Sequence, residues 1–276
     1  MKVKFYGTRG SIPVCEKEFQ EFGGNTTCVL VTIGENIPFI LDAGSGIRNL
    51  GKDILKAPEF KDREIYLSFS HFHWDHIQGF PFFNPAYHST KRITISAIGK
   101  GRAATDLRGI FETQMDEAYF PIPLEKMGAQ FTFLQSEENV LSVEGAMVTV
   151  LKHNHPGGAY SYRIDDGDSI LVFCTDIEHG ESIDERVVAL AQGADVLIHD
   201  SQYTPEELVR KRGWGHSSWE QAIEVAERAG VNRLILTHHD PDHNDEFLQE
   251  VEKNCQARFP NSQLAREKME IECQPC

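Results

Sequence analysis

The sequence predicts an α/β protein in which helices cover packed β-sheets. Short apolar runs, each closed by glycine or a polar break, dominate the first half of the chain, while helical and strand-like segments alternate in the second. No Pro-, Ser- or Gly-rich linker divides the two halves. Strands that precede alternating units are typical of sheets with helices on their outer faces. We therefore expect residues 1–276 to form a single domain.

Strands are expected first, because five early segments combine β-branched and aromatic residues with a terminal turn signal. They are KVKFYG (2–7), CVLVTIG (28–34), PFILDAG (38–44), EIYLSFSH (64–71) and RITISAIG (92–99). A helix is expected near residues 103–115. Two further strands, MVTVLKHNH and SILVFCTD, flank the turn DDGD.

The second half is expected to alternate helices and strands. Helices are predicted over residues 184–192, 204–211 and 217–229, and strands over ADVLIHD and VNRLILTH. The last helix has the clearest signals, because Ser217 and Glu220 match a capping box and Gly230 suits a helix end. Its apolar stripe consists of Trp219, Ala222, Ile223 and Ala226.

Charge and composition exclude several classes of protein. The formal net charge is −15, so the chain lacks the long-range field that attracts duplex DNA or bulk RNA. No segment is long and apolar enough to span a bilayer, and the N-terminus has no apolar signal region, so we expect a cytoplasmic protein. The six scattered cysteines favour free thiols, and the Cys273/Cys276 pair lacks a second pair to complete a zinc knuckle.

Polar residues follow several of the predicted strands, where α/β proteins commonly bind ligands. They are Asp42, His71, His155, Asp176 and His238. In a strand a side chain two residues away points to the same face, so spacing alone does not distinguish His155 from His153. Five such positions in one chain indicate a shared site.

The segment HFHWDH places four metal-affine side chains within six residues. In an extended chain His71 and His73 point to one face and can reach one cation, while Asp75 and His76 follow the strand and can address a second. Imidazole nitrogen suits zinc, iron or manganese, and a carboxylate can bridge two ions. A surface loop is the alternative, but Trp74 and the apolar residues that follow argue for burial. We therefore expect a metal site.

HFHWDH resembles the His-x-His-x-Asp-His motif of the metallo-β-lactamase fold superfamily, and the remaining strand-end residues occur in the order used there. The segments HPGGAYSYRI and GHSSWEQAIEVAERAGVNRLILTH resemble the phosphodiesterase branch that includes tRNase Z. The resemblance spans most of the chain from Asp42 onwards. It implies a four-layer αββα sandwich of two mixed sheets with outer helices.

The resemblance also implies a dinuclear site with two divalent ions, zinc first and manganese or iron as alternatives. One ion would be held by three histidines and the other by Asp75 and two further histidines, with Asp176 bridging. The two histidine sets are His71, His73 and His155, and His76 and His238. Asp42 resembles the aspartate that orients the histidines of this cluster without binding an ion itself.

Two such ions would bridge a water and lower its pKa towards neutrality, and Asp75 would orient or deprotonate it. His216 matches a histidine of tRNase Z-like enzymes and is the candidate proton donor to the leaving group. Asp200 stands where that branch has a short acidic motif, and we expect it to orient His216.

The favoured function is hydrolysis of small phosphodiesters, with 3′,5′-cyclic nucleotides first. N-terminal stretches such as GTRGSIP resemble a bacterial group that includes cyclic nucleotide phosphodiesterases. The arm that grips tRNA in tRNase Z would lie between His155 and Asp176, where this chain has room only for a strand, a turn and a strand. Long nucleic acid is therefore not the expected partner. RNA 3′-end cleavage, lactone or thioester hydrolysis and a non-catalytic metal-binding module are the alternatives, and the resemblance allows for a homodimer.

Overall fold

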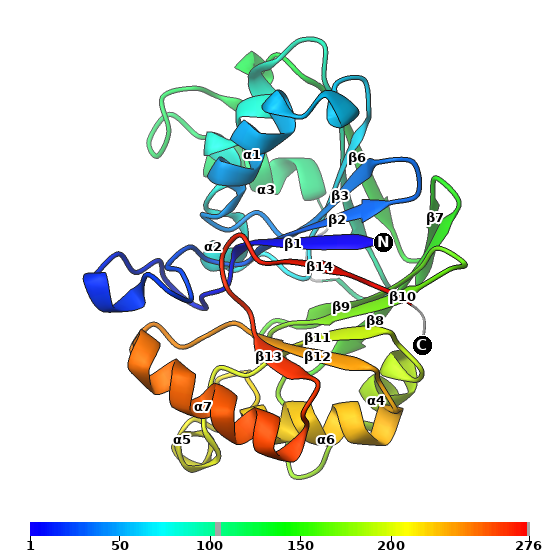
Figure 1. The fold of residues 1–276 in the computed structure, drawn as a ribbon. Coiled ribbons are helices and arrows are strands. Elements are labelled where there is room, and N and C mark those ends of the chain that lie inside the picture. Colours follow the sequence, from blue (N-terminus) through cyan, green and yellow to red (C-terminus); the bar gives the residue numbers. More distant parts are fainter. Residues whose placement is uncertain (103–105, 275–276) are drawn as a thin grey trace.

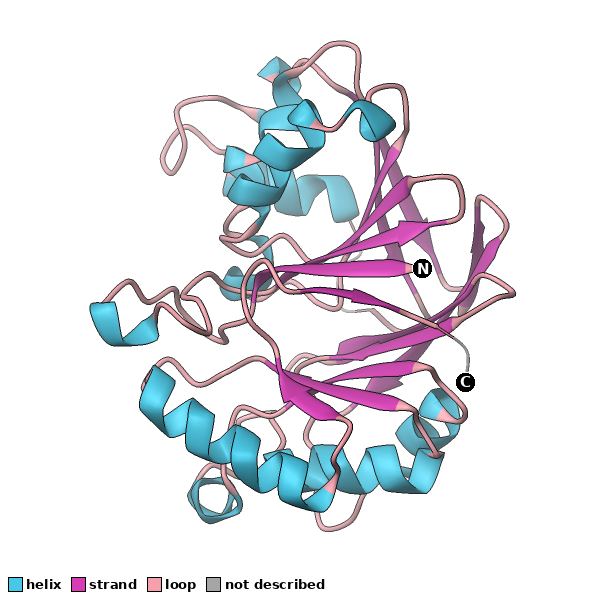
Figure 2. Ribbon diagram, in the orientation of Figure 1, coloured by secondary structure: helices cyan, strands magenta, loops and turns pink. Residues whose placement is uncertain are grey.

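The computed structural model describes residues 1–102 and 106–274, and these form four layers, two sheets between two layers of helices (Figures 1 and 2). The first sheet has seven strands in the order β14-β1-β2-β3-β4-β5-β6. Their bounds are β14 Glu270–Glu272, β1 Lys2–Gly7, β2 Cys28–Ile33, β3 Ile37–Leu41, β4 Ile65–Ser68, β5 Arg92–Ile98 and β6 Gln130–Ser136.

The second sheet also has seven strands, in the order β13-β12-β11-β10-β9-β8-β7. Their bounds are β13 Ser262–Leu264, β12 Arg233–Thr237, β11 Val196–Asp200, β10 Ile170–Cys174, β9 Ala159–Asp165, β8 Ala146–His153 and β7 Val140–Val143. Both sheets are mixed, since β3 to β6 and β10 to β13 pair in parallel and the other pairs are antiparallel.

Helices cover the outer face of each sheet (Figure 1). The α-helices are α1 Ile47–Lys56, α2 Trp74–Ile77, α3 Leu107–Gln114, α4 Glu185–Ala191, α5 Pro205–Arg210, α6 Trp219–Ala229 and α7 Asp245–Arg258. No helix among these described residues is long and apolar enough to cross a membrane. The predicted four-layer fold class is confirmed.

Three apolar clusters correspond to the three interfaces between the layers. One lies between the sheets, one between the first sheet and its helices, and one between the second sheet and α4, α6 and α7. Within β10, Leu171 and Phe173 face the other sheet while Val172 and Cys174 face the helices. A strand buried on both faces reads as a continuous apolar run, which explains why these strands were recognisable in the sequence.

The structure corrects the start of α6. The capping box is formed by Ser218 and Gln221, whereas Ser217 lies before the helix and donates through its hydroxyl to the Ile177 carbonyl at 2.6 Å. Gly230 ends the helix in a left-handed conformation, as predicted. Of the helix expected near residues 103–115, the first three residues lie outside the described part of the chain, and the remainder contains α3.

Several elements were not anticipated from the sequence: α1, α7, β6, β7, β13 and β14. α1 contains Gly51, a poor helix former, but a Cβ there would lie 2.9 Å from Pro85 and 3.0 Å from Phe83, so its absence serves packing. α7 had a readable start, because Asn244 caps it by accepting a hydrogen bond from the Phe247 N–H.

Candidate metal centre

Polar side chains from both sheets meet at the edge where the parallel strands end. Asp42 directly follows β3, Asp176 lies two residues beyond β10, and His238 directly follows β12. These three residues have positive φ angles of 62°, 54° and 65°. Non-glycine residues adopt this left-handed conformation rarely, and it concentrates at functional sites where surrounding contacts hold it. The backbone therefore turns sharply at each strand end.

The first donor group consists of His71, His73 and His155, whose donor atoms all lie within 4.8 Å of one another. His155 Nε2 is 3.1 Å from His73 Nδ1, and the ring centroids of His71 and His73 are 4.4 Å apart. His71 and His73 follow β4 of the first sheet, whereas His155 follows β8 of the second. This group therefore joins the two sheets.

The second donor group consists of Asp75, His76, Asp176 and His238, again with donor atoms within 4.8 Å of one another. Asp75 and His76 lie on the short helix α2. Asp75 Oδ2 is 3.2 Å from His76 Nε2 and 3.3 Å from His238 Nε2. All four side chains are buried, so their nitrogen and oxygen donors converge away from bulk water.

Asp176 lies between the two groups. Its Oδ1 is 3.7 Å from His71 Nε2 and 3.8 Å from His155 Nε2. Its Oδ2 is 3.1 Å from His76 Nε2 and 3.3 Å from His238 Nε2. One carboxylate oxygen thus faces each donor group, which is the arrangement that a carboxylate shared by two cations requires.

Asp42 supports the cluster from within the first sheet. Its Oδ2 is 2.9 Å from His76 Nδ1, and its carboxylate accepts the Ser70 N–H at 2.7 Å and the Ser70 hydroxyl at 2.8 Å. Ser70 Oγ is in turn 3.0 Å from His71 Nδ1. One buried carboxylate therefore orients a histidine of each donor group, directly or through Ser70.

Three supporting residues were not predicted from the sequence: Ser70, Gln202 and Gly215. Gln202 Oε1 lies 3.0 Å from His238 Nδ1, and the Gly215 carbonyl lies 2.8 Å from His155 Nδ1. Gly215 has a φ of +93°, and a Cβ there would lie 2.2 Å from His155 Nδ1. Their sequence neighbourhoods carry no periodic signal, because Gln202 and Gly215 contact histidines that are distant in the sequence and Ser70 connects its neighbour His71 to the distant Asp42.

Burial determines the protonation of the first donor group. It lowers the pKa of His71, His73 and His155 below the ordinary histidine value. The proximity of His76 lowers that of His71 further. These imidazoles are therefore neutral near pH 7, which is the form in which histidine binds a metal ion.

In the second donor group the pKa values of the histidines shift in the opposite direction. Burial lowers the pKa of His76 and His238, but Asp176 and Asp75 outweigh it, so both pKa values rise, that of His238 to about 9. Burial raises the pKa of Asp176, yet His238 and His76 bring it well below its usual range. Two buried carboxylates thus draw positive charge into this group, and a divalent cation supplies such charge.

The residues present fit divalent ions. Nε2 of His71 is buried and has no hydrogen-bond partner within residues 1–102 and 106–274, although buried polar groups are seldom unpaired. It points to the space that His73, His155 and Asp176 share. Imidazole and carboxylate donors in this number suit zinc, manganese or iron alike.

Residues 39–239 match the family model described as the β-lactamase superfamily domain. The chain belongs to this superfamily. A relative named Ribonuclease Z from Prochlorococcus marinus (strain NATL1A) is 25% identical over 325 aligned positions that cover 99% of each chain. Another Ribonuclease Z, from Gemmatimonas aurantiaca, is 40% identical over 88 residues, covering 32% of this chain and 28% of the relative. The predicted family and hydrolase class are confirmed.

Solved structures of the β-lactamase superfamily share the fold over nearly the whole chain. The metallo-β-lactamase fold protein YhfI from Bacillus subtilis has a TM-score of 0.70 at 22% identity, covering 98% of both chains. The short form of human tRNase Z has a TM-score of 0.70 at 19% identity and 99% coverage of both. Yeast PDE1 has a TM-score of 0.65 at 14% identity and 98% coverage of both. The TM-scores show a common fold at these low identities.

His216 lies beside both donor groups of this β-lactamase-superfamily chain. Its ring stacks on that of His238 with centroids 4.9 Å apart and stands edge-on to that of His155 at 5.4 Å. Its Nδ1 is 2.9 Å from Asp200 Oδ2, while Asp200 Oδ1 accepts the Ser217 N–H at 2.8 Å. Proximity alone would let His216 join a further donor group, but the bond to Asp200 occupies Nδ1.

The structure separates His153 from His155, the pair that spacing left open. His153 is buried outside the cluster, with Nε2 3.1 Å from the Asp176 carbonyl and Nδ1 2.9 Å from the Ser161 hydroxyl. His155 Nε2 instead faces the other donors. His239 bonds the Ala265 carbonyl through Nε2 at 2.9 Å.

The expectation that Trp74 is buried is wrong. Its side chain is 66% exposed, whereas Ile77 and Phe80 are buried in the first sheet's helix-side cluster. The segment is anchored by these later residues, and His73 and Trp74 remain at the surface. The opening of the site therefore lies on this side.

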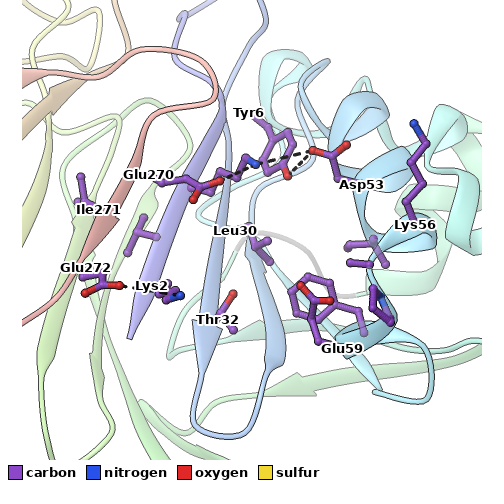
Figure 3. A pocket seen from close by; sticks show the side chains of 16 residues that line it. Lys2, Tyr6, Leu30, Thr32, Asp53, Lys56, Glu59, Glu270, Ile271 and Glu272 are labelled. Carbon is purple, nitrogen blue, oxygen red and sulfur yellow. Dashed lines mark hydrogen bonds and ion pairs between the residues drawn. The ribbon is translucent and has the colours of Figure 1, made fainter.

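A groove in the first sheet is separate from the metal cluster. It has a volume of about 610 Å³ and lies between α1 and the outer face of β14, β1 and β2 (Figure 3). Several of its polar groups pair with one another, as Lys4 Nζ does with Glu270 at 2.7 Å and the Tyr6 hydroxyl with Asp53 at 2.9 Å. A smaller pocket of about 190 Å³ opens beside His71 and His73.

Proposed function

We propose that this protein is a dinuclear metal-dependent phosphodiesterase that hydrolyses small phosphodiesters, with 3′,5′-cyclic nucleotides as the first candidates. The observation that carries the proposal is the pair of donor groups on either side of Asp176, with His216 held next to both. The ions, when bound, would supply Lewis acidity and a water of lowered pKa. We assign His71, His73 and His155 to one ion and Asp75, His76 and His238 to the other, with Asp176 shared.

Asp75 is suited to orient the attacking water by accepting a hydrogen bond from it. Its contacts with described residues involve Oδ2, which accepts the Ser11 N–H at 2.8 Å and faces His76 and His238. These contacts hold the carboxylate in place and leave Oδ1 as the acceptor. Burial raises the pKa of Asp75, but His76 and His238 outweigh it and lower the pKa, so the carboxylate stays ionised at neutral pH.

His216 is suited to donate a proton to the leaving oxygen. Asp200 holds Nδ1 and so presents Nε2 as the donating atom, as an orienting carboxylate does for a catalytic histidine. The leaving group of a cyclic nucleotide is an alkoxide, which needs a proton far more than a phenolate does.

The room around the site favours a small substrate. Only β9, a tight turn and β10 separate His155 from Asp176, and the net charge of −15 offers no long-range attraction to RNA. The alignment with the Prochlorococcus Ribonuclease Z spans 325 positions although this chain has 276 residues, so that relative carries segments absent here.

RNA 3′-end cleavage is the second candidate, and the relatives named Ribonuclease Z favour it. A precursor tRNA and a panel of cyclic mononucleotides, tested on the same metal-loaded sample, separate the two. We expect faster turnover of a cyclic mononucleotide. Faster processing of precursor tRNA would establish the second candidate instead.

Three variants test the assignment of residues. His73→Ala should abolish turnover and reduce the metal content, while His88→Ala, an exposed histidine outside the cluster, should change neither. His216→Ala should slow a cyclic nucleotide about 10²-fold or more yet spare an aryl phosphodiester, whose leaving group needs no acid. Metal-loaded protein inert towards every phosphodiester would defeat the proposal, and lactones and thioesters would then be tested.

A further inference from the structure

Two of the chain's three tryptophans are exposed, and both are close in the sequence to residues that form or contact the donor groups. Trp74 is 66% exposed and stands between His73 and Asp75. Trp214 is 60% exposed and precedes Gly215, whose carbonyl contacts His155. Trp219, in contrast, packs partly buried against the helices of the second sheet.

The backbone around Trp214 is held firmly. The Glu178 carboxylate accepts the N–H groups of Gly213 and Gly215, each at 2.8 Å. The Trp214 N–H donates to the Lys211 carbonyl at 3.1 Å, and Lys211 Nζ lies 4.2 Å from the indole centroid. The indole is thus presented from a fixed loop rather than from a flexible one.

Trp74 is held in a similar way. It is the first residue of α2, and its carbonyl accepts the Gln78 N–H at 2.7 Å. Ile77 of the same helix is buried, so the helix cannot turn to hide the indole without exposing Ile77. Leaving a large aromatic side chain in water forgoes burial that would stabilise the fold.

We propose that Trp74 and Trp214 form a stacking surface for the bases of nucleotide substrates. This proposal rests on the proposed phosphodiesterase function and names its substrate class, nucleotidic rather than simple alkyl or aryl diesters. Every base has a π face, so stacking on indole holds nucleotides with little dependence on sequence. In a chain with a net charge of −15, such contacts provide attraction that the overall field does not.

Binding of adenosine 5′-monophosphate and ribose 5-phosphate tests the proposal, because the two share a sugar phosphate and differ in the base. Calorimetry on metal-loaded protein should show at least tenfold tighter binding of the nucleotide. Trp74→Ala and Trp214→Ala should each weaken nucleotide binding by roughly five- to tenfold or more, while ribose 5-phosphate binding and metal content stay unchanged. For a hydrolysed nucleotide, KM should rise with kcat retained.

Met147→Ala is the matched control. Met147 is also about half exposed, but it lies near the start of β8, six residues from the strand end at His153 and thus roughly 20 Å away along the strand. The Met147→Ala variant should bind both ligands with the affinities of the unmodified protein. In addition, the nucleotide should quench the tryptophan fluorescence, and the quenching should shrink in either tryptophan variant.

Equal affinity for the two ligands, or tryptophan variants that bind the nucleotide normally, would overturn the stacking proposal and leave the phosphodiesterase assignment standing. Base-dependent binding without hydrolysis of any phosphodiester would instead support the stacking surface and refute the catalytic function. The two failures are therefore distinguishable.

Discussion

Replacing Gly10 by alanine would press a methyl group against His238. A Cβ at Gly10 would lie 2.4 Å from Cε1 and Nδ1 of His238 and 2.9 Å from Oε1 of Gln202. Carbon atoms in contact normally lie about 3.5–4.0 Å apart, so the ring must move by roughly 1 Å. Neither side can yield freely, because the Gly10 N–H donates to the His239 carbonyl at 3.0 Å and Gln202 holds His238.

We expect this displacement to weaken the binding of one ion and to leave the binding of the other unchanged. Disturbing the residues that orient a ligand typically costs 10- to 100-fold in metal affinity, and overpacking costs about 1–3 kcal/mol of stability. The ion assigned to Asp75, His76 and His238 should show this loss. The ion assigned to the three other histidines should keep its affinity, because the atoms nearest to a Cβ at Gly10 belong to His238 and Gln202.

Equilibrium dialysis followed by elemental analysis would measure the stoichiometry and both affinities. Gly193→Ala is the control, since Gly193 has a φ of +64° and a Cβ there would meet nothing within 4 Å. It should lower stability by about 1 kcal/mol and keep both ions. A folded Gly10→Ala protein that binds two ions with unchanged affinity would refute the reasoning. If the variant does not fold, Gln202→Leu, which removes the acceptor for His238, must show the same selective loss.

Three further predictions concern two buried polar residues and the metal ions. Asp42→Ala removes the partner of His76 and Ser70, so it should lower the free energy of unfolding by about 3 kcal/mol and weaken metal binding. Urea denaturation measures the first effect, and unchanged stability would contradict the prediction. Arg9 is fully buried and donates to the carbonyls of Gly23, Asp240 and His243, so Arg9→Met should cost about 3 kcal/mol or more in the same assay, and a near-neutral result would argue against these bonds. Removing the metal ions with a chelator should lower the melting temperature by roughly 5–10 °C relative to protein with ions at about 100 times their Kd. Adding the ions back should restore the melting temperature. A melting temperature that does not respond to the chelator would argue against a stabilising metal site.

The residues of the two donor groups could be singled out from the sequence because they are marked locally. The HFHWDH segment follows an apolar run, and Asp42, Asp176 and His238 each follow a strand that is buried on both faces and is therefore recognisable. The helices α4, α5 and α6 were found because their caps and apolar stripes are short-range signals. The one-residue error in the capping box of α6 arose because Ser217 and Ser218 are adjacent, and only the packing of Ser217 against Ile177 decides between them.

Other features could not be read from the chain. Gln202 and Gly215 orient histidines that are distant in the sequence, and Ser70 links its neighbour His71 to the distant Asp42, so the local sequence gives no sign of these roles. The exposure of Trp74 was missed because the apolar residues that follow from Ile77 onwards suggested that the whole segment is buried. Only the orientation of α2, anchored by Ile77, places the indole at the surface.

The amino-acid order alone determined which side chains bear metal-affine atoms, which strands carry them and which superfamily the chain belongs to. The tertiary structure decided that these atoms share one space. Strands β3 and β4 of the first sheet and β10 to β12 of the second run so that their ends meet at one edge, and Asp176 turns one oxygen to each donor group. The physical reason is that donor chemistry and strand periodicity are local properties, whereas convergence depends on how two sheets pair and pack across more than a hundred residues.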